Sequence, residues 1–324
     1  MSRGKERLRL RRACSGAAGL VFLVAQGCRG AGREPEAPAF PPRVEPAAPP
    51  APTLPPAEPA PPARTDDAIL VAGERVSIGT RVVLWTEAPF YDAYAERPRF
   101  AASGPEGPRH RPGREGLGER PGLKELRERV DQIVVHYDAS GSSEQCFRVL
   151  QDVRGLSAHF LLDADGTIYQ TLDVRDQAWH ARKANPRSVG VEIANIGAYP
   201  PAGAQALWDW YGVEPGAERA SGAVAFVEGV VQGQTLVQGE LTPEQYAALV
   251  KLAAGLCRAL PLIRADAPRD HEGRVRDAVL SDAEFERFQG ILGHFHVQQD
   301  KVDPGPAFPW ERLIADVRRE LAAP

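Results

Sequence analysis

A run of prolines near the N-terminus most constrains what this chain can fold into. Between Pro35 and Pro62, 13 of 28 residues are proline, interleaved with alanine and glutamate. Such a stretch cannot bury a core and favours extended polyproline II, so it predicts a semi-rigid spacer. We therefore expect a linker over residues 28–65, with the folded part of the chain after it.

The overall composition is typical of a soluble globular protein. Of the 324 residues, 43% are hydrophobic and 25% charged, and the formal net charge is −4. This balance excludes a strongly basic nucleic-acid binder, and we expect no nucleic-acid partner. Four cysteines are too few for a disulfide scaffold in a chain of this length.

The residues before the proline run have the pattern of an export signal. Residues 1–12 carry six basic side chains, and an apolar run follows from Ala17 to Ala25. This run is about half of the ~20 residues that a membrane-spanning helix needs. A basic region, a short apolar region and then a small residue are typical of a signal peptide, here residues 1–27.

Cys28 directly after Gly27 resembles a bacterial lipobox, in which the cysteine is lipidated and becomes the new N-terminus. Ala25 and Gln26 differ from the residues usual there, so plain secretion and a chance apolar run in a cytoplasmic chain stay open. Arg29 follows, where aspartate would signal inner-membrane retention in the best-known bacteria. We expect a periplasmic lipoprotein, anchored in the outer membrane through a lipid on Cys28.

Residues 66–129 are expected to form an N-terminal extension of unknown role. Arg81–Trp85 is a good strand run, and the Gly/Pro/Arg-rich stretch Arg97–Gly122 predicts a loop. His110 in that loop is expected to be a solvated side chain.

From residue 130 to 324 the chain alternates short apolar runs with helical patterns, which indicates an α/β domain. Strands are predicted at Ile133–Val135, Ser157–Leu162, Thr167–Leu172 and Val189–Asn195, with a hairpin turn at 163–166. Helices are predicted at Ser143–Gln151, Thr242–Leu260 and Trp310–Leu321, the second with Thr242 as its N-cap.

Two histidines and one aspartate are candidates for a metal site. His136 ends the first apolar run, whereas His294 and Asp303 stand nine positions apart near the C-terminus. Two imidazoles and one carboxylate suit a catalytic zinc ion, whose fourth position stays open for water. His296 stands close by as a rival ligand.

Three more polar residues stand near these ligands or inside apolar runs. Glu192 interrupts an apolar run, where a carboxylate is unfavourable unless it is paired, hydrogen-bonded or beside a metal. A position on a solvated face is the alternative for Glu192. Lys301 lies two residues before Asp303, close enough to face the same cleft. His159 is expected in the core or behind a ligand rather than as a ligand.

Six motifs in one order carry a family resemblance over about residues 130–315. They are VVHYDAS, SAHFLLDADGTIYQ, AWHA, VGVEIAN, GH and KVDPGPAFPW. The set resembles the type 2 N-acetylmuramoyl-L-alanine amidases, zinc enzymes that share their fold with peptidoglycan recognition proteins and phage T7-type lysozymes. The resemblance implies a mixed central β-sheet flanked by helices, with zinc at the carboxyl ends of central strands.

The resemblance also implies a role for each matching residue. It assigns the zinc ligands to His136, His294 and Asp303, the general base to Glu192, and stabilisation of the oxyanion to Lys301. The residues it implies for substrate binding are Trp179, His180 and Asn195. A packing role for Trp179 stays open.

The chain departs from the family's short members in two ways. The loop from His294 to Lys301 is about a residue shorter than expected. Extra material at Gly212–Gly239 and Arg264–Gln289 could reshape the substrate groove, and His271 in the second insertion is expected at the surface.

The implied activity is hydrolysis of the amide bond between N-acetylmuramic acid and L-alanine of the stem peptide in peptidoglycan or muropeptides. The alternative is a non-catalytic muropeptide-binding module, although such relatives usually lack a zinc ligand and this chain has the full set. Another zinc amidase or peptidase on the same scaffold also stays open.

Two cysteines remain in the domain, Cys146 and Cys257, both on predicted helices. An exported protein could join them in a disulfide. Two buried thiols are the alternative.

Overall fold

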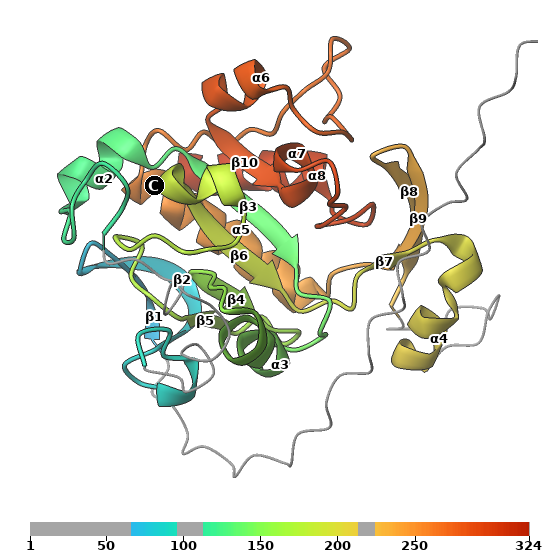
Figure 1. The fold of residues 1–324 in the computed structure, drawn as a ribbon, viewed down its shortest axis with the longest axis horizontal. Coiled ribbons are helices and arrows are strands. Elements are labelled where there is room, and N and C mark those ends of the chain that lie inside the picture. Colours follow the sequence, from blue (N-terminus) through green and yellow to red (C-terminus); the bar gives the residue numbers. More distant parts are fainter. Residues whose placement is uncertain (1–65, 96–112, 213–223, 324) are drawn as a thin grey trace, which may run out of the picture. The chain divides into compact units, whose positions relative to one another are not determined.

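The computed structural model describes residues 66–95, 113–212 and 224–323. They form a seven-stranded sheet, a three-stranded sheet and the helices around them (Figure 1). The expected signal peptide, Cys28, the linker at 28–65 and His110 lie outside the described residues. In the described part, no helix has the length and apolar character needed to cross a bilayer.

The seven-stranded sheet is mixed, which confirms the α/β class with a mixed central sheet flanked by helices. Strands β4, β6, β3 and β10 run parallel to one another, and β5 is antiparallel to β4. In sheet order the strands are β1 (Asp66–Val71), β2 (Glu74–Leu84), β5 (Ile168–Gln170), β4 (Phe160–Leu162), β6 (Ser188–Ile193), β3 (Gln132–Tyr137) and β10 (Gly290–Gly293).

Two long helices, α5 (Pro243–Ala259) and α8 (Trp310–Ala322), stand where periodicity predicted them. α5 begins in a capping box between Thr242 and Gln245, and such an N-cap contributes about 1 kcal/mol to stability. The other helices are η1 (Pro89–Tyr91), α2 (Leu123–Arg129), α3 (Ser143–Arg148), η2 (Val149–Arg154), η3 (Arg182–Arg187), η4 (Pro201–Gly203), α4 (Gln205–Tyr211), α6 (Asp282–Arg287) and α7 (His294–Val297).

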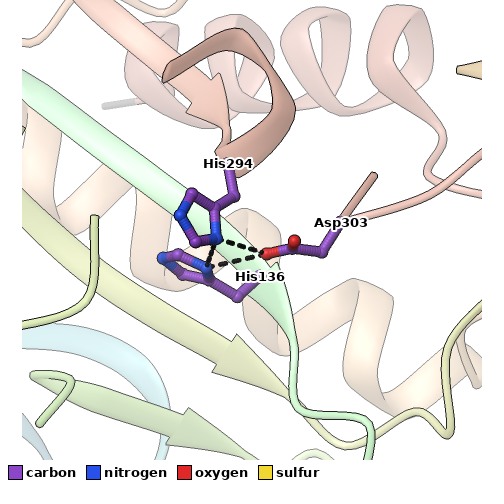
Figure 2. A group of neighbouring side chains, drawn as sticks. All are labelled: His136, His294 and Asp303. Carbon is purple, nitrogen blue, oxygen red and sulfur yellow. Dashed lines mark hydrogen bonds and ion pairs between the residues drawn. The ribbon is translucent and has the colours of Figure 1, made fainter. Parts of the chain in front are cut away.

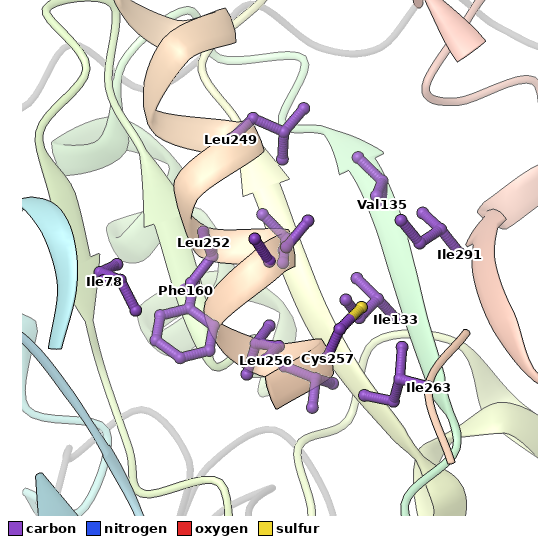
Figure 3. Packing of buried hydrophobic residues seen from close by; sticks show 14 of the residues in the cluster. Ile78, Ile133, Val135, Phe160, Leu249, Leu252, Leu256, Cys257, Ile263 and Ile291 are labelled. Carbon is purple, nitrogen blue, oxygen red and sulfur yellow. The ribbon is translucent and has the colours of Figure 1, made fainter. Parts of the chain in front are cut away.

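The largest apolar core lies between α5 and one face of the sheet. Ile133 and Val135 of β3 pack there with Leu252 and Leu256 of α5 (Figure 3). Because side chains alternate across a strand, Val134 lies on the opposite face, in a smaller cluster with residues of α6 and α7. His136 is two residues after Val134 on β3, so its side chain lies on the same face as that of Val134, away from α5.

Residues 66–95 are part of the sheet rather than a separate appendage. β2 pairs with β5 in parallel, with Val82 opposite Ile168, and β1 covers the outer edge of β2. The predicted run Arg81–Trp85 is only the last part of an 11-residue strand. Sequence analysis missed most of β2 because its first half is polar and half-exposed.

The first insertion contributes two strands, β9 (Gln234–Gly239) and β8 (Phe226–Val231), to a small sheet whose third strand, β7 (Ala198–Tyr199), lies before the insertion. Gln238 of β9 joins it to the segment after Asp303. The Gln238 amide donates to the carbonyl of Pro304 at 2.9 Å and accepts from the N–H of Ala307 at 3.0 Å. The second insertion holds α6 and a loop in which His271 is exposed, as expected.

Cys146 and Cys257 are both buried free thiols. Cys146 packs in a cluster with Phe147 and Leu161. Cys257 is on α5 and packs in the largest core, between α5 and the sheet. The structure therefore has two buried thiols and no disulfide between them.

Candidate functional site

Three side chains from distant parts of the chain point toward one another at the carboxyl ends of β3 and β10 (Figure 2). Nδ1 of His136 lies 3.0 Å from Nδ1 of His294 and 2.8 Å from Oδ2 of Asp303. Nδ1 of His294 lies 3.0 Å from the same oxygen. All three residues are buried. The sheet thus brings one atom of each predicted ligand to a common point.

This donor set fits zinc. A tetrahedral site with bonds of about 2.0–2.1 Å spaces its ligand atoms by roughly 3.3 Å, close to the three separations seen here. Two ring nitrogens that face each other without a cation need a proton between them, whereas a metal satisfies both lone pairs. Within the described residues, this is the only group of three or more His, Cys, Asp or Glu side chains that could hold a metal ion.

The electrostatics of the cluster favour the protonation states that bind metals. Burial, and then His294, lowers the pKa of His136 to about 4, against the opposing effect of Asp303. Burial acts to raise the pKa of Asp303, but the two imidazoles outweigh it and hold that pKa below its ordinary range. Neutral imidazole and ionised carboxylate are the ligand forms.

Glu192 lies beside the cluster on the neighbouring strand. It is the register partner of His136 between β6 and β3, and both side chains face away from α5. Glu192 is 8% exposed, and no group of the described residues donates a hydrogen bond to its carboxylate. Burial, and then the charges of Asp303 and Asp138, raises its pKa well above the ordinary value. The alternative of a solvated face for Glu192 is therefore wrong.

Lys301 brings positive charge to the same place. It lies in the loop between α7 and Asp303, half-buried, and its charge lowers the pKa of both His136 and Glu192. Among the described residues its ammonium has no hydrogen-bond or ion-pair partner. It is therefore available to a ligand that carries negative charge.

The rival ligand His296 is turned away from the cluster. Its Nδ1 accepts from the N–H of Gly293 at 2.9 Å, and its Nε2 donates to the carbonyl of Arg276 at 2.8 Å. Both ring nitrogens are thus used by the backbone. His159 is likewise in the core, with Nδ1 accepting from the N–H of Gly190 at 3.0 Å and Nε2 donating to the carbonyl of Asp176 at 3.0 Å.

His180 contacts a metal-ligand candidate. Its Nδ1 lies 3.0 Å from Nε2 of His136, and its Nε2 lies 3.2 Å from Oγ of Ser188. The ring fits there because Gly190 has no side chain, since a Cβ at that position would lie 2.7 Å from Cγ and Cδ2 of His180. Trp179 precedes His180 and is half-buried. Its backbone N–H donates a hydrogen bond to the hydroxyl of Ser157.

Asn195 is held by internal hydrogen bonds. Its Nδ2 donates to the carbonyl of Gly239 at 3.0 Å, and its Oδ1 accepts from Gly197 at 2.9 Å and from Gln238 at 3.3 Å. The residue is 3% exposed. The amide of Asn195 therefore connects the end of β6 to the small sheet, and its substrate-binding role stays a prediction.

Sequence analysis missed two residues that support the site. Gln298 accepts from Nε2 of His294 at 2.9 Å, and its position four residues after that histidine could have indicated the contact. Arg114 is buried beneath the segment that carries His180 and donates to three backbone carbonyls, those of Val174, Asn185 and Ser188. No pattern in its Gly/Pro/Arg-rich surroundings indicated this role.

A protein-family model described as N-acetylmuramoyl-L-alanine amidase matches residues 126–306, more than half of the chain. The match contains all three metal-ligand candidates, Glu192 and Lys301. Comparison with curated protein sequences gives no match.

Several solved structures resemble the chain. The N-acetylmuramyl-L-alanine amidase AmiD from E. coli, in complex with the substrate anhydro-N-acetylmuramic acid-L-Ala-D-γ-Glu-L-Lys, is 20% identical, with a TM-score of 0.38. That match covers 58% of this chain and 57% of AmiD. The hydrolase AmiA from Staphylococcus aureus is 14% identical over 60% of this chain and 73% of its own, with a TM-score of 0.34. Drosophila PGRP-LB is 16% identical over 73% of this chain and 92% of its own, with a TM-score of 0.33.

Proposed function

The chain belongs to the N-acetylmuramoyl-L-alanine amidase type 2 family, and on that premise we propose that it is a zinc-dependent peptidoglycan amidase. The bond cleaved is the amide between the lactyl group of N-acetylmuramic acid and L-alanine of the stem peptide. One observation carries this proposal: three metal-binding atoms converge beside a buried carboxylate that has no hydrogen-bond donor among the described residues.

His136, His294 and Asp303 would hold the zinc ion through Nδ1, Nδ1 and Oδ2. When bound, zinc supplies Lewis acidity, which polarises the scissile carbonyl and lowers the pKa of a water from 15.7 toward ~7. As the described part of the protein offers only three ligands here, these residues would leave room for water or substrate.

Glu192 is the general base of the proposed reaction. Its carboxylate takes a proton from the attacking water and later delivers it to the leaving amine of L-alanine. The register that pairs Glu192 with His136 supports this role, because it holds the base and a metal ligand side by side on one face. A raised pKa also suits a base that must later act as an acid.

Lys301 stabilises the negative charge that develops on the carbonyl oxygen. Loss of one such donor raises the barrier by roughly 3–4 kcal/mol in other acyl-transfer enzymes. His180, which the resemblance assigns to the substrate pocket, also contacts His136 through its Nδ1.

The test is incubation of the zinc-loaded protein with muropeptides and analysis of the products by mass spectrometry. We expect wild type to release free stem peptide, and Glu192→Ala and EDTA-treated protein not to release it. Muropeptide that stays intact but bound to folded, zinc-loaded protein would instead establish a binding module. Cleavage of a different amide would establish another amidase or peptidase.

We also propose that the chain works in the periplasm as an outer-membrane lipoprotein, based on the signal-like residues 1–27 and the cysteine that follows. Metabolic labelling with a palmitate analogue should label the wild type. Cys28→Ser should abolish the label and release the protein into the soluble periplasmic fraction. An unlabelled wild type would leave plain secretion or a cytoplasmic location.

A further inference from the structure

The two candidate zinc histidines each have their second ring nitrogen in contact with another side chain. Nε2 of His294 meets Gln298 at 2.9 Å, and Nε2 of His136 meets His180 at 3.0 Å. A neutral imidazole that binds a metal through Nδ1 must carry its proton on Nε2. The partner of Nε2 therefore decides how readily Nδ1 is available to the metal.

For His294 the neighbouring groups determine the direction of the hydrogen bond. Oδ1 of Asp300 lies 3.3 Å from the Gln298 amide, and an ionised carboxylate can only accept. The NH₂ group of Gln298 therefore faces Asp300, and its Oε1 faces His294. Because that oxygen can only accept, Nε2 of His294 carries the proton and Nδ1 is left with a lone pair toward Asp303 and His136.

For His136, the side-chain contacts continue through His180 to Ser188. When Nδ1 of His136 binds a metal, its Nε2–H needs an acceptor, and Nδ1 of His180 is in position to accept. Nε2–H of His180 then donates to Oγ of Ser188 at 3.2 Å. His136 is itself buried, and loss of His180 would remove the one side chain of the described residues that contacts its Nε2.

Each partner is held by a segment whose role the sequence left open. Gln232, in the turn between β8 and β9, donates to the backbone carbonyls of Phe295 at 2.9 Å and Gln298 at 3.0 Å. On the other side, Arg114 donates to the carbonyls of Asn185 and Ser188. Oδ1 of Asn185 in turn accepts from the backbone N–H of His180 at 3.1 Å.

We propose that His180 and Gln298 are positioning residues, which hold His136 and His294 with Nδ1 turned to the metal and Nε2–H satisfied. The first insertion and the N-terminal extension support this pair from opposite sides. The inference rests on the proposed zinc site. Loss of a side chain that hydrogen-bonds to a metal ligand typically weakens metal binding by about 10–100-fold.

The experiment measures the zinc dissociation constant of full-length variants by competition with a chromophoric chelator. Gln298→Leu and His180→Phe remove the acceptor but keep most of the volume, and both should bind zinc about 10–100-fold more weakly. Gln298→Glu and His180→Gln restore an acceptor and should bind more tightly than their apolar counterparts. Two exposed positions provide matched controls, Gln205→Leu and His271→Phe, which should bind zinc as the wild type does.

A second readout uses the metal-free protein. Two-bond ¹H–¹⁵N correlation spectra of histidine should show His294 with its proton on Nε2 in wild type and Gln298→Glu, but a mixture of tautomers in Gln298→Leu. Unchanged zinc affinity in the apolar variants, with zinc bound by wild type, would overturn the positioning role and leave the zinc amidase intact. No zinc binding by wild type, together with the tautomer change, would overturn the zinc amidase and keep the control of His294 by Gln298.

Discussion

His136 and Glu192 are register partners on the adjacent parallel strands β3 and β6, and both face away from α5. A candidate metal ligand and a candidate base thus stand side by side because of backbone hydrogen bonding, without any direct bond between their side chains. Shifting one strand by a single residue would turn one of them into the core beneath α5.

Glu192→Gln should lower kcat/KM for muropeptide cleavage by about 10²–10⁴-fold, because the amide cannot accept the proton of the attacking water. Zinc affinity should stay at the wild-type value, since Glu192 is outside the ligand set. In the wild type, activity should fall as pH falls through the raised pKa of Glu192, where the base becomes protonated. A variant that retains full activity would exclude Glu192 as the base.

His294→Ala and His296→Ala should differ sharply, although the two residues are only two positions apart. The first removes a ligand atom. It should weaken zinc binding by more than the ~10–100-fold expected when a side chain that hydrogen-bonds to a zinc ligand is lost. The second leaves the backbone groups of Gly293 and Arg276 without partners, so it should lower stability but keep zinc. Chelator competition and urea unfolding separate the two effects, and the reverse pattern would make His296 the ligand.

Gly190→Ala should displace the ring of His180, because the new Cβ would lie 2.7 Å from two of its atoms. We expect weaker zinc binding and a lower melting temperature. Gly203→Ala is the matched control, since a Cβ there meets nothing within 4 Å. Equal zinc affinity in both variants would mean that the ring of His180 can move without affecting the metal.

Arg114→Ala should lower the free energy of unfolding by about 3 kcal/mol or more, because each buried carbonyl that loses its donor costs about 1–3 kcal/mol. Three carbonyls lose one here, those of Val174, Asn185 and Ser188. Arg120→Ala, at an exposed arginine six residues on, should change little. Urea unfolding of both variants is the measurement, and equal stabilities would show that Arg114 is dispensable.

Asp138 should make stability depend on pH. Its Oδ1 accepts three backbone N–H groups, its Oδ2 has no partner in the described part of the chain, and burial raises its pKa to about 7. Between pH 4 and 7 the folded state therefore binds more protons than the unfolded state, so this residue's contribution to stability falls as pH rises.

Asp138→Asn removes that titration. Relative to the variant, the wild type should lose on the order of 3–4 kcal/mol of stability between pH 4 and pH 8. Unfolding in urea at several pH values measures the difference. Parallel stability curves for the two proteins would show that Asp138 keeps an ordinary pKa when folded.

The sequence by itself determined the features that depend on neighbouring residues. Short apolar runs located β3 and β6, which are buried on both faces, and helical periodicity with a Thr242 cap located α5. The types of the candidate metal ligands and the order of the motifs were also readable, so the family could be recognised before any contact was known.

Only the tertiary structure decided which polar groups meet. It turned His294 rather than His296 to the cluster, engaged the amide of Asn195 with the small sheet, and kept the two cysteines in separate cores. It also joined β2 to β5 and placed Arg114 beneath His180's segment. Most of these groups contact residues that are tens of positions or more away in the sequence. A buried polar group forms its hydrogen bonds with whichever residues the packing of the chain brings next to it.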